Sequence, residues 1–191
     1  DAADYGVPQR RRGFIFVAGR KSTISFASPS TCRRTVRDAF RRLRYVAKFD
    51  KLHNFPEKRA PKVVKIIRLI PKNGGSRLDL GVKNQLVCHF KCNGFKDVYG
   101  RMSWKDVAPT ITGGCCNPSK GRFLHPTRNR AITLREAALL QSFPPTYFFS
   151  AKNGKFAVAE MIGNALPPEF IKRHARKIYS YLKGLSQTAV A

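Results

Sequence analysis

The apolar run GFIFVAG at residues 13–19 limits the fold of this chain more than any other segment. A short apolar run with a glycine at each end is typical of a strand buried inside a sheet. Such a strand needs neighbours, yet few later segments have a residue pattern that would supply them. We therefore expect the elements near the two ends of the sequence to belong to a sheet domain that lies mostly outside it. Residues 22–129 are expected to form a separate small domain.

Helical spacing of apolar residues is visible in five stretches. They are residues 35–49, 62–70, 133–142, 156–162 and a last segment that begins at Pro167 or Pro168. Thr133 and Glu136 have the spacing of a capping box, which predicts where the third helix begins. Gly163 is expected to end the fourth helix, and short strands are expected at residues 86–90 and 97–104.

The chain is strongly basic, with 37 Lys and Arg against 11 Asp and Glu and a net charge of +26. Its 42% of hydrophobic residues is normal for a globular protein and excludes simple disorder. The charge predicts a polyanionic partner, with nucleic acid as the first candidate and an anionic membrane surface or an acidic protein as alternatives. No apolar run is long enough to span a membrane, and no signal peptide is visible, so we expect a cytoplasmic protein.

The chain contains five cysteines, at positions Cys32, Cys88, Cys92, Cys115 and Cys116. Without a secretory signal, reduced thiols are expected. Cys88 and Cys92 lie near His89 and suggest a metal site, but their spacing lacks the paired CxxC framework of zinc sites. We therefore expect no bound metal.

Three segments are best interpreted together: DYGVPQRRRGFIFVAG at residues 4–19, RAITLREAALLQSFPPTY at 130–147 and MIGNALPPEF at 161–170. In this order and spacing they resemble the eighth, ninth and tenth motifs of the DNA (cytosine-5) methyltransferases. Residues 99–126 resemble the target-recognition region of the same family. The resemblance covers nearly the whole chain.

The resemblance implies a particular domain organisation. The chain would be the C-terminal part of a DNA (cytosine-5) methyltransferase with a mixed α/β fold. Residues 1–21 would end the Rossmann-like sheet domain that binds S-adenosylmethionine (SAM), and residues 130–191 would return to it as closing helices. Residues 22–129 would form a small irregular α+β target-recognition domain. The helix at 133–142, with Arg135 and Glu136, would organise these domains against each other and take no part in catalysis.

The family pattern near the start is Gln, any residue, Arg, any residue, Arg. Gln9 and Arg11 match its first two positions, and the resemblance implies that they support the active-site loops. The third position is Gly13, whereas the arginine found there in the family helps to hold the flipped cytosine. Residues 9–12 are also compatible with a solvated basic run before a strand.

Thr110 and Ile111 match the Thr–aliphatic pair that opens the family's recognition loop and touches the DNA backbone near the target base. The resemblance assigns DNA contacts to Thr110, Thr112, Gly113 and Gly114. Four basic residues near this loop are expected to add phosphate contacts: Lys120, Arg122, Arg128 and Arg130. Glycines let a loop approach DNA closely, and hydroxyl and basic groups bind phosphate. The alternative is that Thr110 is an ordinary strand residue, that Gly113 and Gly114 form a turn, and that the basic side chains are solvated.

Gly163, Asn164 and Ala165 lie, by the resemblance, beside the SAM pocket and form part of its wall. A helix break with an asparagine cap explains the same residues without a ligand.

The family's glycine-rich cofactor loop, Pro-Cys nucleophile and Glu-Asn-Val motif do not occur in this sequence. Methylation at cytosine C5 needs a thiolate that attacks C6 and a base flipped out of the duplex. We therefore expect methyl transfer from SAM to duplex DNA only together with an N-terminal catalytic half or subunit, and no activity from this chain alone. The alternatives are a non-catalytic basic DNA-binding module derived from that family and a basic RNA-binding protein.

Overall fold

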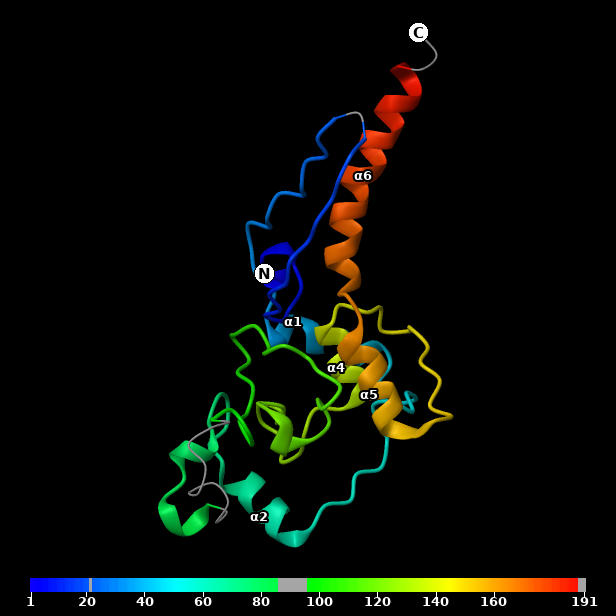
Figure 1. Cartoon of the computed structure of the whole chain (residues 1–191). Helices are drawn as coiled ribbons and strands as arrows, with labels where there is room; N and C mark the ends of the chain where they lie inside the picture. The colour runs from blue at the N-terminus through cyan, green and yellow to red at the C-terminus, as the bar shows by residue number, and fades with distance from the viewer. Residues whose placement is uncertain (21, 86–95, 189–191) are drawn as a thin grey trace.

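The computed structural model describes residues 1–20, 22–85 and 96–188. Figure 1 shows an elongated molecule, with the long helix α6 (Pro168–Thr188) at one end and α2 (Pro61–Leu69) at the other. Between them lie α1 (Val36–Arg41), α4 (Leu134–Leu140) and α5 (Gly154–Asn164). The 3₁₀ turns are Ala2–Tyr5, Arg42–Tyr45, Arg77–Asp79, Val82–Asn84 and Pro118–Lys120.

Helix α4 is the centre of the larger core, since all of its residues are buried. The Thr133 hydroxyl accepts from the backbone N–H of Glu136, and the Glu136 carboxylate accepts from the N–H of Thr133, so the predicted capping box is confirmed. Helix α4 packs against both α1 and α5. A short helix buried on all sides is held by its neighbours more than by its own propensity.

The helix expected over residues 35–49 is shorter than its spacing predicts. The α-helix ends at Arg41, and a 3₁₀ turn follows it. The chain then turns back, which buries Leu52 and pairs the Asp50 carboxylate with the Arg135 guanidinium of α4. The prediction of a helix up to residue 49 is therefore wrong, because these tertiary contacts outweigh the local periodicity.

The prediction that Gly163 ends a helix is also wrong, because α5 continues through it to Asn164. A Cβ atom at position 163 would lie 2.2 Å from the Gly113 nitrogen and 2.3 Å from the Thr112 carbonyl carbon. Glycine is thus required here for the close approach of two backbones rather than for a helix break.

A smaller core lies against α2. It contains Ile66, Ile67, Ile70, Leu80, Tyr99 and Leu124. The predicted helix at 62–70 is confirmed, and it begins one residue earlier, with Pro61 at a position that suits proline because its missing N–H has no partner there.

The expected strands do not form among the described residues, whose only β pairings are isolated bridges. Residues 13–19 are extended and run beside α6 (Figure 1), with Phe14 90% and Phe16 79% exposed. No described segment pairs with residues 13–19 in a ladder, so the buried strand predicted here does not form among the described residues. Its neighbours were expected in a sheet domain that lies mostly outside this sequence. The strand predicted at 97–104 is wrong, since Tyr99 adopts a φ of 57° within a turn.

The start of the chain is anchored on α6. The Tyr5 ring lies 5.1 Å from the Phe170 ring and 4.8 Å from the His174 ring, measured between centroids. The backbone N–H of Ser22 donates to the Tyr181 hydroxyl at 3.2 Å. The predicted last helix is confirmed, and it begins at Pro168.

The strand expected at 86–90 and the trio Cys88, His89 and Cys92 lie outside the described residues. Within the described ranges, no group of three or more His, Cys, Asp and Glu side chains is arranged to hold a metal ion. The described helices also include none that is long and apolar enough to cross a membrane.

Candidate functional site

Three segments that are far apart in the sequence meet at Gln9, which is fully buried. Its side-chain oxygen accepts from the backbone N–H of Ile111 at 2.8 Å, and its amide nitrogen donates to the Gln141 side-chain oxygen. The Gln141 amide nitrogen in turn donates to the Ile162 carbonyl of α5 at 2.6 Å. We call this chain of contacts the glutamine relay.

The orientation of both amides in the glutamine relay is determined by its two ends. The Ile162 carbonyl can only accept, so Gln141 must present its NH₂ group to it and its oxygen to Gln9. Gln9 then uses its NH₂ group toward Gln141 and keeps its oxygen for the Ile111 N–H. The relay therefore links the segment around Ile111 to the end of α5 with every buried polar partner satisfied.

Arg11 makes a second link across the same junction. One of its guanidinium nitrogens donates to the Ile111 carbonyl at 3.1 Å and to the Gly163 carbonyl at 2.9 Å. Gln9 and Arg11 thus bind the two backbone polar groups of Ile111. Beside them, the Thr110 hydroxyl donates to the Arg10 carbonyl at 2.7 Å. The structure therefore brings Gln9, Arg11, Thr110 and Gly163 together.

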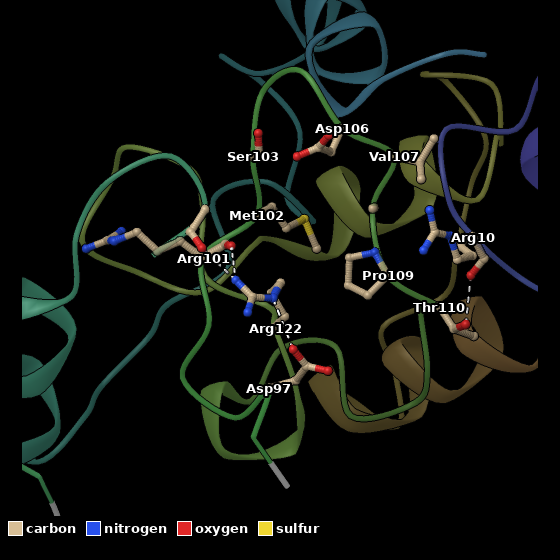
Figure 2. Close-up of a pocket in the computed structure, with 12 residues that line it drawn as sticks. Arg10, Asp97, Arg101, Met102, Ser103, Asp106, Val107, Pro109, Thr110 and Arg122 are labelled. Atoms are coloured by element: carbon tan, nitrogen blue, oxygen red, sulfur yellow. Dashed lines mark hydrogen bonds and ion pairs between the residues drawn. The ribbon is translucent and has the colours of Figure 1, made fainter. Parts of the chain in front are cut away.

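A pocket of about 600 Å³ opens next to this junction (Figure 2). Thr110 and Arg10 lie on one side, and Asp97 and Arg122 lie on another. The Arg122 guanidinium donates to Asp97 at 3.2 Å and to the carbonyls of Gly74 and Arg101 at 2.8 and 3.1 Å. Arg122 therefore shapes the pocket wall through protein carbonyl groups.

The other residues of the expected recognition loop do not line this pocket. Gly113 faces α5, where an added Cβ would lie 3.3 Å from the Glu160 Cα. An added Cβ at Gly114 would lie 2.8 Å from the Lys120 Cβ, so this turn is tight. Thr112 and Lys120 are exposed, and the Thr112 hydroxyl accepts from the N–H of Gly114 at 3.3 Å.

Sequence reasoning missed Arg101, which is fully buried. Its guanidinium donates to five oxygen atoms, those of the Ile67, Ile70, His125 and Arg128 carbonyls and of the Asn129 side chain. These bonds tie the last turn of α2 to the loop at 125–129. The only sequence signal was an arginine between apolar residues. Gln141 was also missed, although it lies four residues after the buried Ala137 on the same helix face.

His125 is buried beside Glu136 and is held neutral. Burial lowers the pKa of His125 to about 4, and neighbouring arginines reinforce the effect while Glu136 opposes it. The geometry agrees, because its Nδ1 accepts from the N–H groups of Thr127 and Arg128 at 3.1 and 3.0 Å. The Arg130 guanidinium binds the Glu136 carboxylate through two bonds of 2.7 Å. Arg130 is therefore committed to an internal ion pair.

Cys115, which lies within the expected recognition loop, does not have the properties of a nucleophile. Cys115 and Cys116 are buried, and their sulfur atoms lie 4.0 Å apart. The hydrogen bond with Cys116, together with burial, raises the pKa of the Cys115 thiol well above its ordinary value. A protonated, buried thiol does not attack a ring carbon. The same hydrogen bond lowers the pKa of the Cys116 thiol, which is buried as well.

Comparison with known proteins shows the family to which the chain belongs. Residues 1–180 match the family model described as "C-5 cytosine-specific DNA methylase". The chain belongs to this family, and its sequence identity with several relatives agrees with this assignment.

The chain is 37% identical over 196 residues to "Type II methylase M.HgiDII" of Herpetosiphon aurantiacus, covering 96% of this chain and 55% of that protein. It is 32% identical over 174 residues to "Type II methyltransferase M1.HphI" of Haemophilus parahaemolyticus, covering 88% of this chain and 43% of that protein. A plant relative, "DNA (cytosine-5)-methyltransferase 3" of Arabidopsis thaliana, is 39% identical over 87 residues, which cover 45% of this chain and 6% of that protein. The chain spans about half the length of the two bacterial relatives.

Proposed function

We propose that this chain is the C-terminal portion, or a small subunit, of a DNA (cytosine-5) methyltransferase. In this assignment residues 1–21 and 130–191 belong to the catalytic domain, and residues 22–129 form the target-recognition domain. The observation that carries the proposal is the junction at Ile111, where Gln9 and Arg11 bind both backbone groups and Arg11 also reaches Gly163. Rigid coupling of a DNA-reading segment to a catalytic pocket is what positioning of a target base requires.

The proposed DNA contacts are Thr110, Thr112, Gly113, Gly114, Lys120 and Arg122. Thr110 is exposed, and its hydroxyl is oriented by the bond to the Arg10 carbonyl, which leaves its lone pairs at the rim of the pocket. Lys120 is exposed, and its ammonium group has no ion-pair partner among the described residues, so it can bind phosphate. Arg122 contributes a positive charge to the pocket while it holds the wall in place.

SAM would supply the methyl group, and this chain offers one side of a site for it. Asn164 is exposed at the end of α5, and Ala165 is half-buried. Leu166 and Pro167 open onto an apolar pocket of about 290 Å³ that Phe14 also lines. Arg11 and Arg12 also line this pocket, and apolar walls with a few polar groups fit a nucleoside in kind. In the proposal these residues orient the ligand and exclude water, and the remaining walls come from the N-terminal half.

The second candidate is a non-catalytic DNA-binding module of the same family. It is favoured by the burial of both cysteines of the recognition loop, Cys115 and Cys116. Both candidates bind duplex DNA, so binding alone does not separate them. Catalytic rescue by a complementary half does.

The deciding experiment is a labelled-methyl transfer assay on mixed-sequence duplex DNA. The chain is tested alone and together with the N-terminal half of the Herpetosiphon methylase. The alignment of this chain with that methylase covers 55% of the methylase. We expect no transfer by the chain alone and SAM-dependent transfer by the pair. Methylation by the isolated chain would contradict the proposed division of labour. Failure of a well-folded N-terminal half to restore activity would favour the non-catalytic module.

The same assay tests the recognition loop. Thr110→Ala is expected to weaken binding to all DNA sequences alike, since it removes a backbone contact. Exchange of residues 113–119 for those of a relative is expected to change the methylated sequence, since base-edge contacts set the choice of site. An unchanged site after the exchange would show that recognition lies elsewhere.

A further inference from the structure

A further pocket, of about 380 Å³, contains none of the residues to which the proposed function assigns DNA or SAM contacts. Four side chains line it: Arg37, Phe40, Arg41 and Trp104. Arg37 and Arg41 are one turn apart on α1 and are exposed. Phe40 and Trp104 form an apolar wall, with their rings edge to face at 5.7 Å. We call this set the α1 pocket.

The two arginines of the α1 pocket are available for a ligand. Within the described residues, the Arg37 side chain has no ion-pair partner. Arg41 has only a loose contact of 3.7 Å with Asp38, and its side chain remains 70% exposed. Asp38 itself is held by Thr35, whose backbone N–H and hydroxyl both donate to its carboxylate. Residues 33–44 contain six arginines and a single acidic residue, so the local potential attracts an anion.

The α1 pocket and the pocket at Thr110 are lined by residues of the same loop. Ser103 and Asp106 line the larger pocket, and Trp104, between them in sequence, lines the α1 pocket. This loop is fixed to α1, because the N–H groups of Val36 and Arg37 donate to the carbonyls of Asp106 and Trp104 at 2.9 and 3.2 Å. In Figure 2 the loop through Ser103 and Asp106 rises from the larger pocket toward a neighbouring helical segment. One loop therefore forms a wall of both pockets.

We infer that the α1 pocket is a second DNA contact, in which Arg37 and Arg41 bind neighbouring phosphates of one strand and Trp104 packs against the sugar between them. This inference rests on the proposed DNA-binding function and extends it to residues outside the recognition loop. Residues four apart on a helix are about 6 Å apart at Cβ, and flexible arginine side chains then reach adjacent phosphates. An indole offers the apolar contact that a deoxyribose ring needs.

The chain has a built-in reporter for this contact, since Trp104 is its only tryptophan. The full chain is titrated with labelled duplex DNA, and DNA anisotropy and tryptophan fluorescence are recorded together. We expect the fluorescence of Trp104 to change and saturate at the same DNA concentration as the anisotropy. Arg37→Gln with Arg41→Gln is expected to remove most of this fluorescence change. It should also lower the slope of log affinity against log salt by about 1.8, because each phosphate contact contributes about 0.9.

The matched control is Lys172→Gln with Arg176→Gln, which removes the same charge at the same spacing from the exposed surface of α6. This variant is expected to keep the tryptophan response. A response that is equal in both double variants would overturn the inference. So would an equally strong response to polyglutamate, because the pocket would then bind acidic polypeptides. Loss of all anisotropy change in the unmodified chain would instead contradict the proposed DNA-binding function itself.

Discussion

At the scale of single residues, the junction depends on amide groups whose orientation is fixed by their neighbours. Gln141 stands between a group that donates to it, the Gln9 NH₂, and one that accepts from it, the Ile162 carbonyl. At neutral pH, a leucine of similar size offers neither group and a glutamate offers only the acceptor. The glutamine relay is therefore expected to be sensitive to substitutions that preserve its volume.

Gln141→Leu is expected to lower the free energy of unfolding by about 1–3 kcal/mol, because it leaves the Gln9 NH₂ and the Ile162 carbonyl buried without partners. Gln141→Glu keeps the acceptor and loses the donor, so it should regain stability as the pH falls and the carboxyl group protonates. Denaturant titrations measure both effects. Gln85→Leu is the control, since Gln85 is half-buried and bonds locally to the Leu80 carbonyl. An equal cost at both positions would contradict the special role of the relay.

His125 gives the folded chain a defined dependence on pH. Burial lowers the pKa of His125 to about 4 in the folded chain, whereas an unfolded histidine has a pKa near 6.5. Below about pH 6.5 the unfolded state binds a proton that the folded state does not. The free energy of unfolding should therefore fall by up to about 3 kcal/mol between about pH 6.5 and pH 4 and be flat above that range.

The groups that face His125 are Glu136, Arg130, Arg128 and Arg101, and those arginines disfavour the protonated ring. His125→Gln keeps an acceptor near the two backbone N–H groups and removes the titrating ring. Denaturant unfolding of this variant between pH 4 and 7 should show a shallower loss of stability toward acid. An unchanged slope would show that other groups, such as His53, dominate.

At the scale of elements, the close approach of α5 to the recognition segment explains Gly163. Gly163→Ala is expected to cost about 1–3 kcal/mol or more, because the new methyl group would collide with the backbone of Thr112 and Gly113. Gly184→Ala on α6 is the matched control. Nothing lies within 4 Å of a Cβ there, so it should stabilise the helix by up to about 1 kcal/mol. Thermal unfolding of the two variants should shift in opposite directions, and a shift of the same sign would contradict this packing.

The helices with capping residues could be predicted from sequence. Helix ends that are set by tertiary contacts could not. Thr133 and Glu136 predict the start of α4 because a capping box involves only residues that are close in sequence. The early end of α1 depends on an ion pair between Asp50 and Arg135, which are 85 residues apart. The glycine at position 163 of α5 is required by the backbone at Gly113, which is 50 residues away in sequence. No spacing rule contains such contacts.

The candidate site could be predicted in part for the same reason. The roles expected of Gln9 and Arg11 came from a resemblance in short motifs, and the structure adds their partner atoms. Gln141 and Arg101 were not predicted, because each donates hydrogen bonds to backbone carbonyl groups that are distant in sequence. A buried polar residue of this kind has no sequence pattern of its own.

At the scale of the whole molecule, one extended segment exposes unusual apolar surface. Phe14 and Phe16 alternate along residues 13–19 and are 90% and 79% exposed, beside the apolar pocket that Leu166 and Phe170 also line. An exposed apolar edge of this kind usually marks a contact with another chain or domain. In the proposed enzyme, that contact is the N-terminal half.

Phe14→Ser with Phe16→Ser should therefore change the free energy of unfolding of the isolated chain by no more than about 0.5 kcal/mol, because little burial is lost. The same variant should bind the N-terminal half of the Herpetosiphon methylase at least about tenfold more weakly, since two buried aromatic contacts would be removed from the interface. Phe49→Ser is the control, because Phe49 is 84% exposed and far from this segment in sequence. Titration calorimetry of each variant against that half measures the difference. If the double variant bound as tightly as the Phe49 variant, residues 13–19 would not be the contact with the N-terminal half. The assembly would then have to form through another face of the chain.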